Sequence, residues 1–75
     1  MANLTASIAT IGVLVNGEFR EVAAMTLAEA LEALDYADAI VATALNGDFV
    51  PARERAATPL RQGDRIEIVS PRQGG

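Results

Sequence analysis

The chain has 75 residues, of which 51% are apolar and 21% are charged, so it is long enough for one small domain with a packed core. It contains neither cysteine nor histidine, which excludes disulfides, thiolate metal sites and the usual general base, and makes an enzyme a poor expectation. No apolar run approaches the roughly 20 residues of a membrane span, and the first ten residues lack the basic region of a signal peptide. We therefore expect a cytoplasmic protein with no membrane partner.

The balance of charges limits the classes of partner that we expect for this protein. Ten acidic residues face six basic ones, for a net charge of −4, and all six basic residues are arginine. A nucleic-acid binder needs clustered cations to neutralise phosphates, and this chain has no basic run. The sequence therefore predicts no nucleic-acid partner and favours a protein partner with a basic docking surface.

The first half of the chain begins with a predicted β-hairpin. Residues 8–15 are largely β-branched and apolar, which indicates a strand. Asn16-Gly17 follows, and this pair is a strong hairpin signal because both residues tolerate positive φ. Residues 18–24 then form the predicted return strand, in which we expect Phe19 to pack in the core.

A helix is predicted next. Thr26 occupies an N-cap position, and Glu29 three residues later completes a capping box. Met25, just before the cap, is expected to pack against Ala30 as a hydrophobic staple. The helix shows one apolar stripe at helical spacing, formed by Leu27, Ala30, Leu31 and Leu34.

The end of this helix has no glycine to take the left-handed conformation that commonly terminates helices. The apolar stripe fades at Asp35 and Tyr36. Short polar side chains tolerate the left-handed region, so we expect Asp35 or Asp38 to adopt it.

The second half of the chain is predicted to be mostly strand. The almost wholly apolar residues 40–45 indicate a third strand that lies inside the sheet. A second Asn-Gly pair turns the chain into a short strand that Pro51 ends. The remaining expected elements are a short helical turn at 52–57, an extended bridge at 58–60, a turn at 62–64 and a last strand at 65–70.

The predicted order is β-β-α-β-β-β. A helix that follows a hairpin must cross the sheet before the third strand, and a mixed sheet with the helix on one face is the compact solution. We therefore predict an α+β fold of the β-grasp, or ubiquitin-like, type with about five strands. Residues 1–75 form one domain in this prediction, with a possible N-terminal extension at 1–10 and an exposed tail at 71–75.

The carboxyl terminus is the strongest candidate for chemistry. Pro71 stops the last strand, and Gly74 and Gly75 precede the free carboxylate. Glycine has no Cβ, so a narrow tunnel in a partner enzyme can close around the backbone of such a tail. The terminal carboxylate can then be activated as an acyl-adenylate without steric hindrance. In this interpretation, the folded domain is what the partner enzyme recognises, and the terminal carboxylate is the group that reacts.

Three stretches resemble the ThiS family of sulfur carriers in thiamin biosynthesis. They are VNGE at residues 15–18, TLAEALEAL at 26–34 and ALNGDFVPARERAATPLRQGDRIEIVSPRQGG at 44–75. The resemblance covers most of the chain from Ile11 to Gly75. One departure is Asp35, which stands where many relatives have glycine.

The resemblance implies a chemistry. A ubiquitin-activating-like adenylyltransferase would use ATP to adenylate the Gly75 carboxylate, and sulfur drawn from cysteine by a desulfurase would convert it to a thiocarboxylate. A thiazole synthase would then accept the tail and take its sulfur. Gly75 is thus implied as the sulfur-carrying residue, with Gly74, Gln73, Arg72 and Pro71 as the tail that threads the partner's active site. The protein would be a co-substrate that binds no cofactor or metal.

Two alternatives stay open from the sequence. Within the carrier class, the chain could be the small subunit of molybdopterin synthase or a carrier for cysteine synthesis or tRNA thiolation. In another class, it could be a non-conjugating ubiquitin-like binding module that works through its sheet face. Phe49 and Leu60 are candidates for a docking patch on that face, with the core as the equally weighted alternative.

Overall fold

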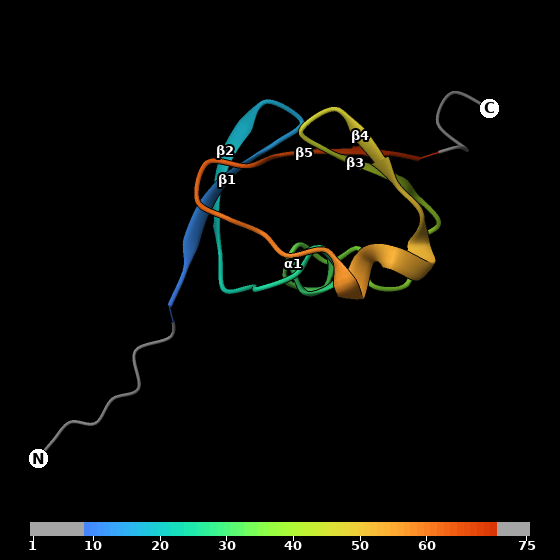
Figure 1. Ribbon diagram of the computed structural model, residues 1–75, viewed down its shortest axis with the longest axis horizontal. Helices are drawn as coiled ribbons and strands as arrows, with labels where there is room; N and C mark the ends of the chain where they lie inside the picture. Colours follow the sequence, from blue (N-terminus) through green and yellow to red (C-terminus); the bar gives the residue numbers. More distant parts are fainter. Residues whose placement is uncertain (1–8, 71–75) are drawn as a thin grey trace, which may run out of the picture.

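The computed structural model describes residues 9–70, which form a five-stranded sheet with a helical layer on one face (Figure 1). This order confirms the predicted β-β-α-β-β-β sequence, including the short helical turn before the last strand. The elements in chain order are β1 (Ile11–Val15), β2 (Glu18–Val22), α1 (Leu27–Ala33), β3 (Ala42–Leu45), β4 (Asp48–Val50), the 3-10 helix η1 (Ala52–Ala57) and β5 (Arg65–Val69).

The strands lie in the order β2-β1-β5-β3-β4, so the last strand is the central one. β1 and β5 are parallel and the other pairs are antiparallel, which makes the sheet mixed, as predicted. β3 has a partner on both sides, in agreement with its predicted internal position. It begins at Ala42 rather than at Ile40, because Ala42 pairs with Val69, the last residue of β5, and Ile40 has no strand beside it.

Both Asn-Gly pairs form the predicted two-residue hairpin turns. Asn16 and Gly17 have φ values of 51° and 85°, and Asn46 and Gly47 have values of 52° and 91°. Two consecutive positive φ values are the signature of the type I′ turn, whose twist matches that of the flanking strands. The two hairpins, β1–β2 and β3–β4, therefore follow from local sequence alone.

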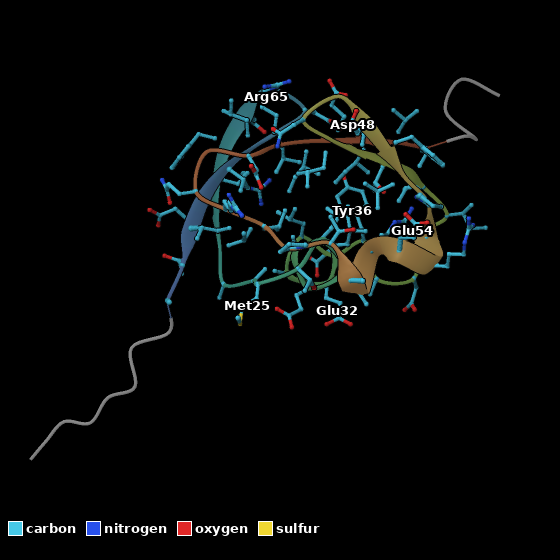
Figure 2. All side chains as sticks on the ribbon, in the orientation of Figure 1. Met25, Glu32, Tyr36, Asp48, Glu54 and Arg65 are labelled. Atoms are coloured by element: carbon cyan, nitrogen blue, oxygen red, sulfur yellow. The ribbon has the colours of Figure 1, made fainter. Side chains whose placement is uncertain are left out.

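The start of α1 confirms the predicted cap in part. The Glu29 backbone N–H donates to Thr26 Oγ1 at 3.2 Å, and Glu29 Oε1 accepts from the Met25 N–H at 2.7 Å. The staple prediction is wrong, because the Met25 side chain is exposed and points away from the sheet (Figure 2). The Met25 backbone is engaged elsewhere: its carbonyl accepts from the Leu60 N–H at 3.0 Å, which ties the entry of α1 to the segment before β5.

The end of α1 confirms that Asp35 takes the left-handed conformation, with φ of 71°. The Tyr36 N–H donates to Leu31 O at 2.7 Å, and the Asp35 N–H donates to Glu32 O at 3.1 Å. These two bonds define a Schellman motif, which normally carries glycine at the position of Asp35. Tyr36 is half-buried and packs against the core (Figure 2).

The core lies between α1 and the sheet face that the helix covers, here called the inner face. Its buried apolar members are Val13, Val15, Val22, Ala24, Leu27, Ala30, Leu31, Val50, Leu60, Ile66 and Ile68. Phe19 is absent from this set, so the prediction that it packs in the core is wrong. It pairs with Leu14, which places both side chains on the face opposite to Val13 and Val15, and Phe19 is 60% exposed.

Candidate functional site

The central strand β5 leads to the carboxyl terminus of the chain. Its last paired residue is Val69, and Ser70 is the last residue that the structure describes. The tail residues singled out by the sequence lie outside the described residues: Pro71, Arg72, Gln73, Gly74 and Gly75. The structure therefore shows where the tail begins, at the end of the central strand, and which surfaces of residues 9–70 lie beside that point.

An apolar patch lies on the sheet face that α1 does not cover, here called the open face. It consists of Ala42, Ala44, Phe49 and Val69. Ala42 is opposite Val69, and Ala44 lies between Phe49 of β4 and Glu67 of β5, so the patch crosses β4, β3 and β5 and has Glu67 beside it. Phe49 is 70% exposed and Val69 is 59% exposed. An exposed aromatic ring beside small residues is a typical anchor for a protein partner. The Val69 end of this patch adjoins Ser70, and Phe49 lies two strands away.

The other side of the open face is built differently. Phe19 is exposed there, but its ring lies over the backbone of β1: a Cβ added to Gly12 would come 2.6 Å from the ring atom Cε1. The Gly12 N–H also donates to Gln62 Oε1 at 2.9 Å. The ring of Phe19 thus shields the polar backbone of β1 at Gly12.

The two predicted docking residues have different fates. Leu60 is only 9% exposed and belongs to the core. The prediction of Leu60 as a docking residue is therefore wrong, and the alternative that placed it in the core is confirmed. The reason is the extended bridge before β5, whose Thr58 and Leu60 bond to the backbone of Leu27 and Met25 and bring the Leu60 side chain under the sheet. Phe49 is exposed on the open face, as a docking residue must be, and its functional role stays a prediction.

A polar network that the sequence analysis missed holds the strands beneath the apolar patch. Thr43 is 2% exposed, and its hydroxyl donates to Val50 O at 2.8 Å while accepting from Arg55 Nε at 3.0 Å. Arg55 Nη2 also donates to Val41 O at 2.7 Å. Arg55 of η1 therefore ties the start of β3 to the end of β4, and the buried hydroxyl is fully satisfied. The only sequence signal was a threonine within an otherwise apolar strand.

A shallow hollow of about 200 Å³ is lined by residues of α1 and η1. Both helices lie on the side of the sheet opposite to the open face (Figure 1). Neither Phe49 nor Leu60 lines the hollow, and its polar side chains are Glu32, Tyr36 and Arg55. Between residues 9 and 70, no cluster of acidic side chains has the arrangement of a metal site. The same part of the chain contains no helix that is both long and apolar enough to cross a membrane.

The comparison with protein families establishes the family to which the chain belongs. The model of the ThiS family matches residues 13–75, which include β1 from Val13, all later elements and the terminal Gly-Gly. The chain belongs to the ThiS family. A crystal structure described as thiamine biosynthesis protein ThiS, from Geobacter metallireducens, is 30% identical to it. That similarity covers 87% of this chain and 100% of the other, with a TM-score of 0.73. No curated protein matches the chain.

These findings confirm the predicted β-grasp fold and the resemblance to ThiS proteins. The family match also covers the residues of the apolar patch. In this ThiS-family protein, the patch and the tail belong to one matched segment, and Val69 of the patch ends the strand that leads to Ser70 and the tail.

Proposed function

We propose that this ThiS-family protein is a sulfur carrier whose Gly75 carboxylate becomes a thiocarboxylate and supplies sulfur for the thiazole ring of thiamin. Membership of the family and the likeness to a thiamine biosynthesis protein support a carrier role in thiamin biosynthesis. The protein acts as a co-substrate of other enzymes in the cytoplasm and binds no cofactor itself. ATP is used by the activating partner.

The proposed chemistry takes place at the terminal carboxyl carbon. The Gly75 carboxylate attacks the α-phosphorus of ATP and releases pyrophosphate, which leaves an acyl-adenylate. A desulfurase takes sulfur from cysteine as an enzyme persulfide, and a thiol reductant releases it as hydrosulfide while the thiol is oxidised to a disulfide. The hydrosulfide then forms a bond to the carbonyl carbon while the bond to AMP breaks. The product is a thiocarboxylate. Glycine at both terminal positions leaves the reacting carbon unhindered and lets a narrow active site close around the backbone.

The observation that carries this proposal is the apolar patch beside the start of the tail. A carrier must be recognised by its folded body while its terminus enters the partner's active site. Val69 directly precedes Ser70, the last described residue, and Phe49 lies on the same face two strands away, so the two offer exposed apolar anchors on the open face. The net charge of −4 favours a partner whose docking surface is basic. We assign this surface to the adenylyltransferase and, in a later encounter, to the thiazole synthase.

The proposal is tested by the intact mass of the protein. The purified chain is incubated with a carrier-activating adenylyltransferase, ATP, cysteine, a cysteine desulfurase and a thiol reductant. We expect a mass gain equal to the exchange of one oxygen for one sulfur. A variant that lacks Gly74 and Gly75 should show no gain while keeping the circular dichroism spectrum of the parent, because no core residue is altered. Unchanged mass of the full chain beside an active enzyme would refute the carrier function and favour a binding module.

The acceptor is tested by a second incubation. The thiocarboxylate form is mixed either with a thiazole synthase and its other substrates or with the large subunit of molybdopterin synthase. We expect loss of the sulfur only in the first mixture. Loss in the second mixture alone would refute the assignment to thiamin biosynthesis and leave the carrier chemistry standing.

A further inference from the structure

The side chain of Asn16 holds the central strand β5 close to its end. The Asn16 N–H donates to Ile66 O at 2.9 Å, as expected for the next rung of the β1–β5 ladder. The amide group then makes two more bonds: Oδ1 accepts from the Ile68 N–H at 2.8 Å, and Nδ2 donates to Ile68 O at 3.1 Å. Both main-chain polar groups of Ile68 are therefore engaged by one side chain.

The backbone of Asn16 explains why a side chain is needed there. With φ of 51°, the chain turns away into β2, so β1 ends at Val15, the partner of Ile66. A continuing parallel strand would offer its own carbonyl to the Ile68 N–H. The amide oxygen of Asn16 takes the place of that carbonyl, and the amide nitrogen adds a bond to Ile68 O. Asparagine suits this position because it tolerates positive φ and carries both an acceptor and a donor.

The second Asn-Gly turn uses the same device at the opposite end of β5. The Asn46 N–H donates to Arg65 O at 2.8 Å, and Asn46 Oδ1 accepts from the Arg65 N–H at 2.9 Å. Asn46 Nδ2 donates to Asp64 Oδ1 at 3.0 Å. The two asparagines thus have nearly equal φ values and equivalent roles, but Asn46 holds the first residue of β5 and Asn16 holds the last but one.

On its other side, Ile68 lies beside β3, to which its own main-chain N–H and carbonyl do not bond. Ile68 pairs with Thr43 of β3, and Thr43 is fixed by Arg55 and Val50 as described above. The end of β5 is therefore enclosed between an amide on the β1 side and a braced strand on the β3 side. Ser70 follows two residues later, so the direction in which the chain leaves the sheet depends on this enclosure.

We propose that Asn16 is a positioning residue for sulfur transfer: it holds β5 at Ile68 so that Val69 and Ser70 leave the sheet in a fixed direction relative to the apolar patch. This inference rests on the proposed carrier function. A partner that binds the patch needs the terminal carboxylate at one place in its active site, and reacting groups displaced by about 1 Å can lose roughly a hundredfold in rate.

The test compares Asn16→Gly with Asn46→Gly in the full-length chain. Glycine tolerates positive φ and keeps both type I′ turns, so each variant removes the side-chain hydrogen bonds of its asparagine. For Asn46 these are the bond to the Arg65 N–H and the bond to Asp64 Oδ1. The first readout is the ¹⁵N relaxation order parameter of the Val69 and Ser70 amides. The second is the steady-state rate of sulfur loading by the adenylyltransferase system, with KM and kcat for the carrier determined separately. Dispersed ¹H–¹⁵N spectra show that each variant is folded.

We expect Asn16→Gly to lower the order parameters of Val69 and Ser70 and to reduce kcat by roughly tenfold or more with little change in KM, because the apolar patch is untouched. Asn46→Gly should leave both readouts near those of the parent. Asn16→Asp, which keeps the acceptor for the Ile68 N–H but loses the donor, should fall between the two. Equal effects of Asn16→Gly and Asn46→Gly on either readout would overturn the proposal.

The two readouts separate this inference from the function on which it rests. If the parent chain accepts no sulfur from an active loading system, the carrier function fails, and the order parameters still decide whether Asn16 holds the end of β5. If the parent is loaded and Asn16→Gly is loaded at the same kcat, the carrier function stands and the positioning role of Asn16 is refuted.

Discussion

The two faces of the sheet differ sharply although they share the same backbone. Along β5, Ile66 and Ile68 lie on the inner face and are buried against α1, whereas Glu67 and Val69 lie on the open face and are exposed. Successive side chains of one strand thus alternate between the core and the exposed surface. Substitutions on the inner face should affect stability, and those on the open face should affect encounters with partners. The first three predictions below test this division, and the fourth concerns the end of α1; they run from the largest expected effect to the smallest.

The largest effect is expected from Ile66→Ala on the inner face. Ile66 is almost fully buried, and truncation of such a residue to alanine costs about 2–5 kcal/mol through lost burial and the cavity that remains. Val69→Ala on the same strand is the matched control and should change the free energy of unfolding by less than about 0.5 kcal/mol. Urea unfolding followed by circular dichroism measures both. Similar losses in the two variants would contradict the division between the faces.

Thr43→Val should cost about 1–3 kcal/mol, because the variant leaves Val50 O and Arg55 Nε without their buried partner. Valine has nearly the volume of threonine, so the change isolates the hydroxyl. Ala42→Val on the exposed side of the same strand is the control and should be nearly neutral, since β-branched residues suit strands. The same unfolding experiment applies, and a Thr43→Val variant as stable as the parent would show that the network contributes nothing.

Phe49→Ala addresses the open face. We expect the free energy of unfolding to change by less than about 0.5 kcal/mol, because the ring is mostly exposed. The KM for the carrier in sulfur loading should rise roughly fivefold to thirtyfold, which corresponds to about 1–2 kcal/mol of lost binding. Phe19→Ala removes an equally large exposed ring at the other edge and should leave KM unchanged. A rise in KM for Phe19→Ala but not for Phe49→Ala would place the docking surface at the β2 edge of the sheet and contradict its assignment to the apolar patch.

The smallest effect belongs to the end of α1, which lies on neither face of the sheet. Asp35→Gly should stabilise the protein by about 0.5 kcal/mol, because glycine adopts positive φ without the cost that a Cβ imposes. Asp38→Gly is the control: Asp38 does not have positive φ, so the extra backbone freedom of glycine should bring no gain. Thermal unfolding resolves a difference of this size. Destabilisation by Asp35→Gly would imply that the aspartate side chain contributes more than its backbone conformation costs.

Much of the fold could be predicted because its signals are local. The type I′ turns at Asn16 and Asn46 need only two adjacent residues that tolerate positive φ. The cap at Thr26 and the left-handed Asp35 are likewise decided within a few residues of the chain. The burial of Phe19 and Leu60 was not predictable in this way. It depends on which face each element turns toward the helix, and that is set by pairing between distant segments.

By itself, the sequence determined the order of the elements, the two hairpins, the helix and its ends, and the candidate chemistry of a Gly-Gly carboxyl terminus. Only the tertiary structure decided that the last strand is central, that Phe49 and Val69 share a patch, and that Asn16 bonds to Ile68. The physical reason is the separation along the chain. Asn16 and Ile68 are 52 residues apart, and only the parallel pairing of β1 with β5 brings a turn residue to the strand that leads into the tail.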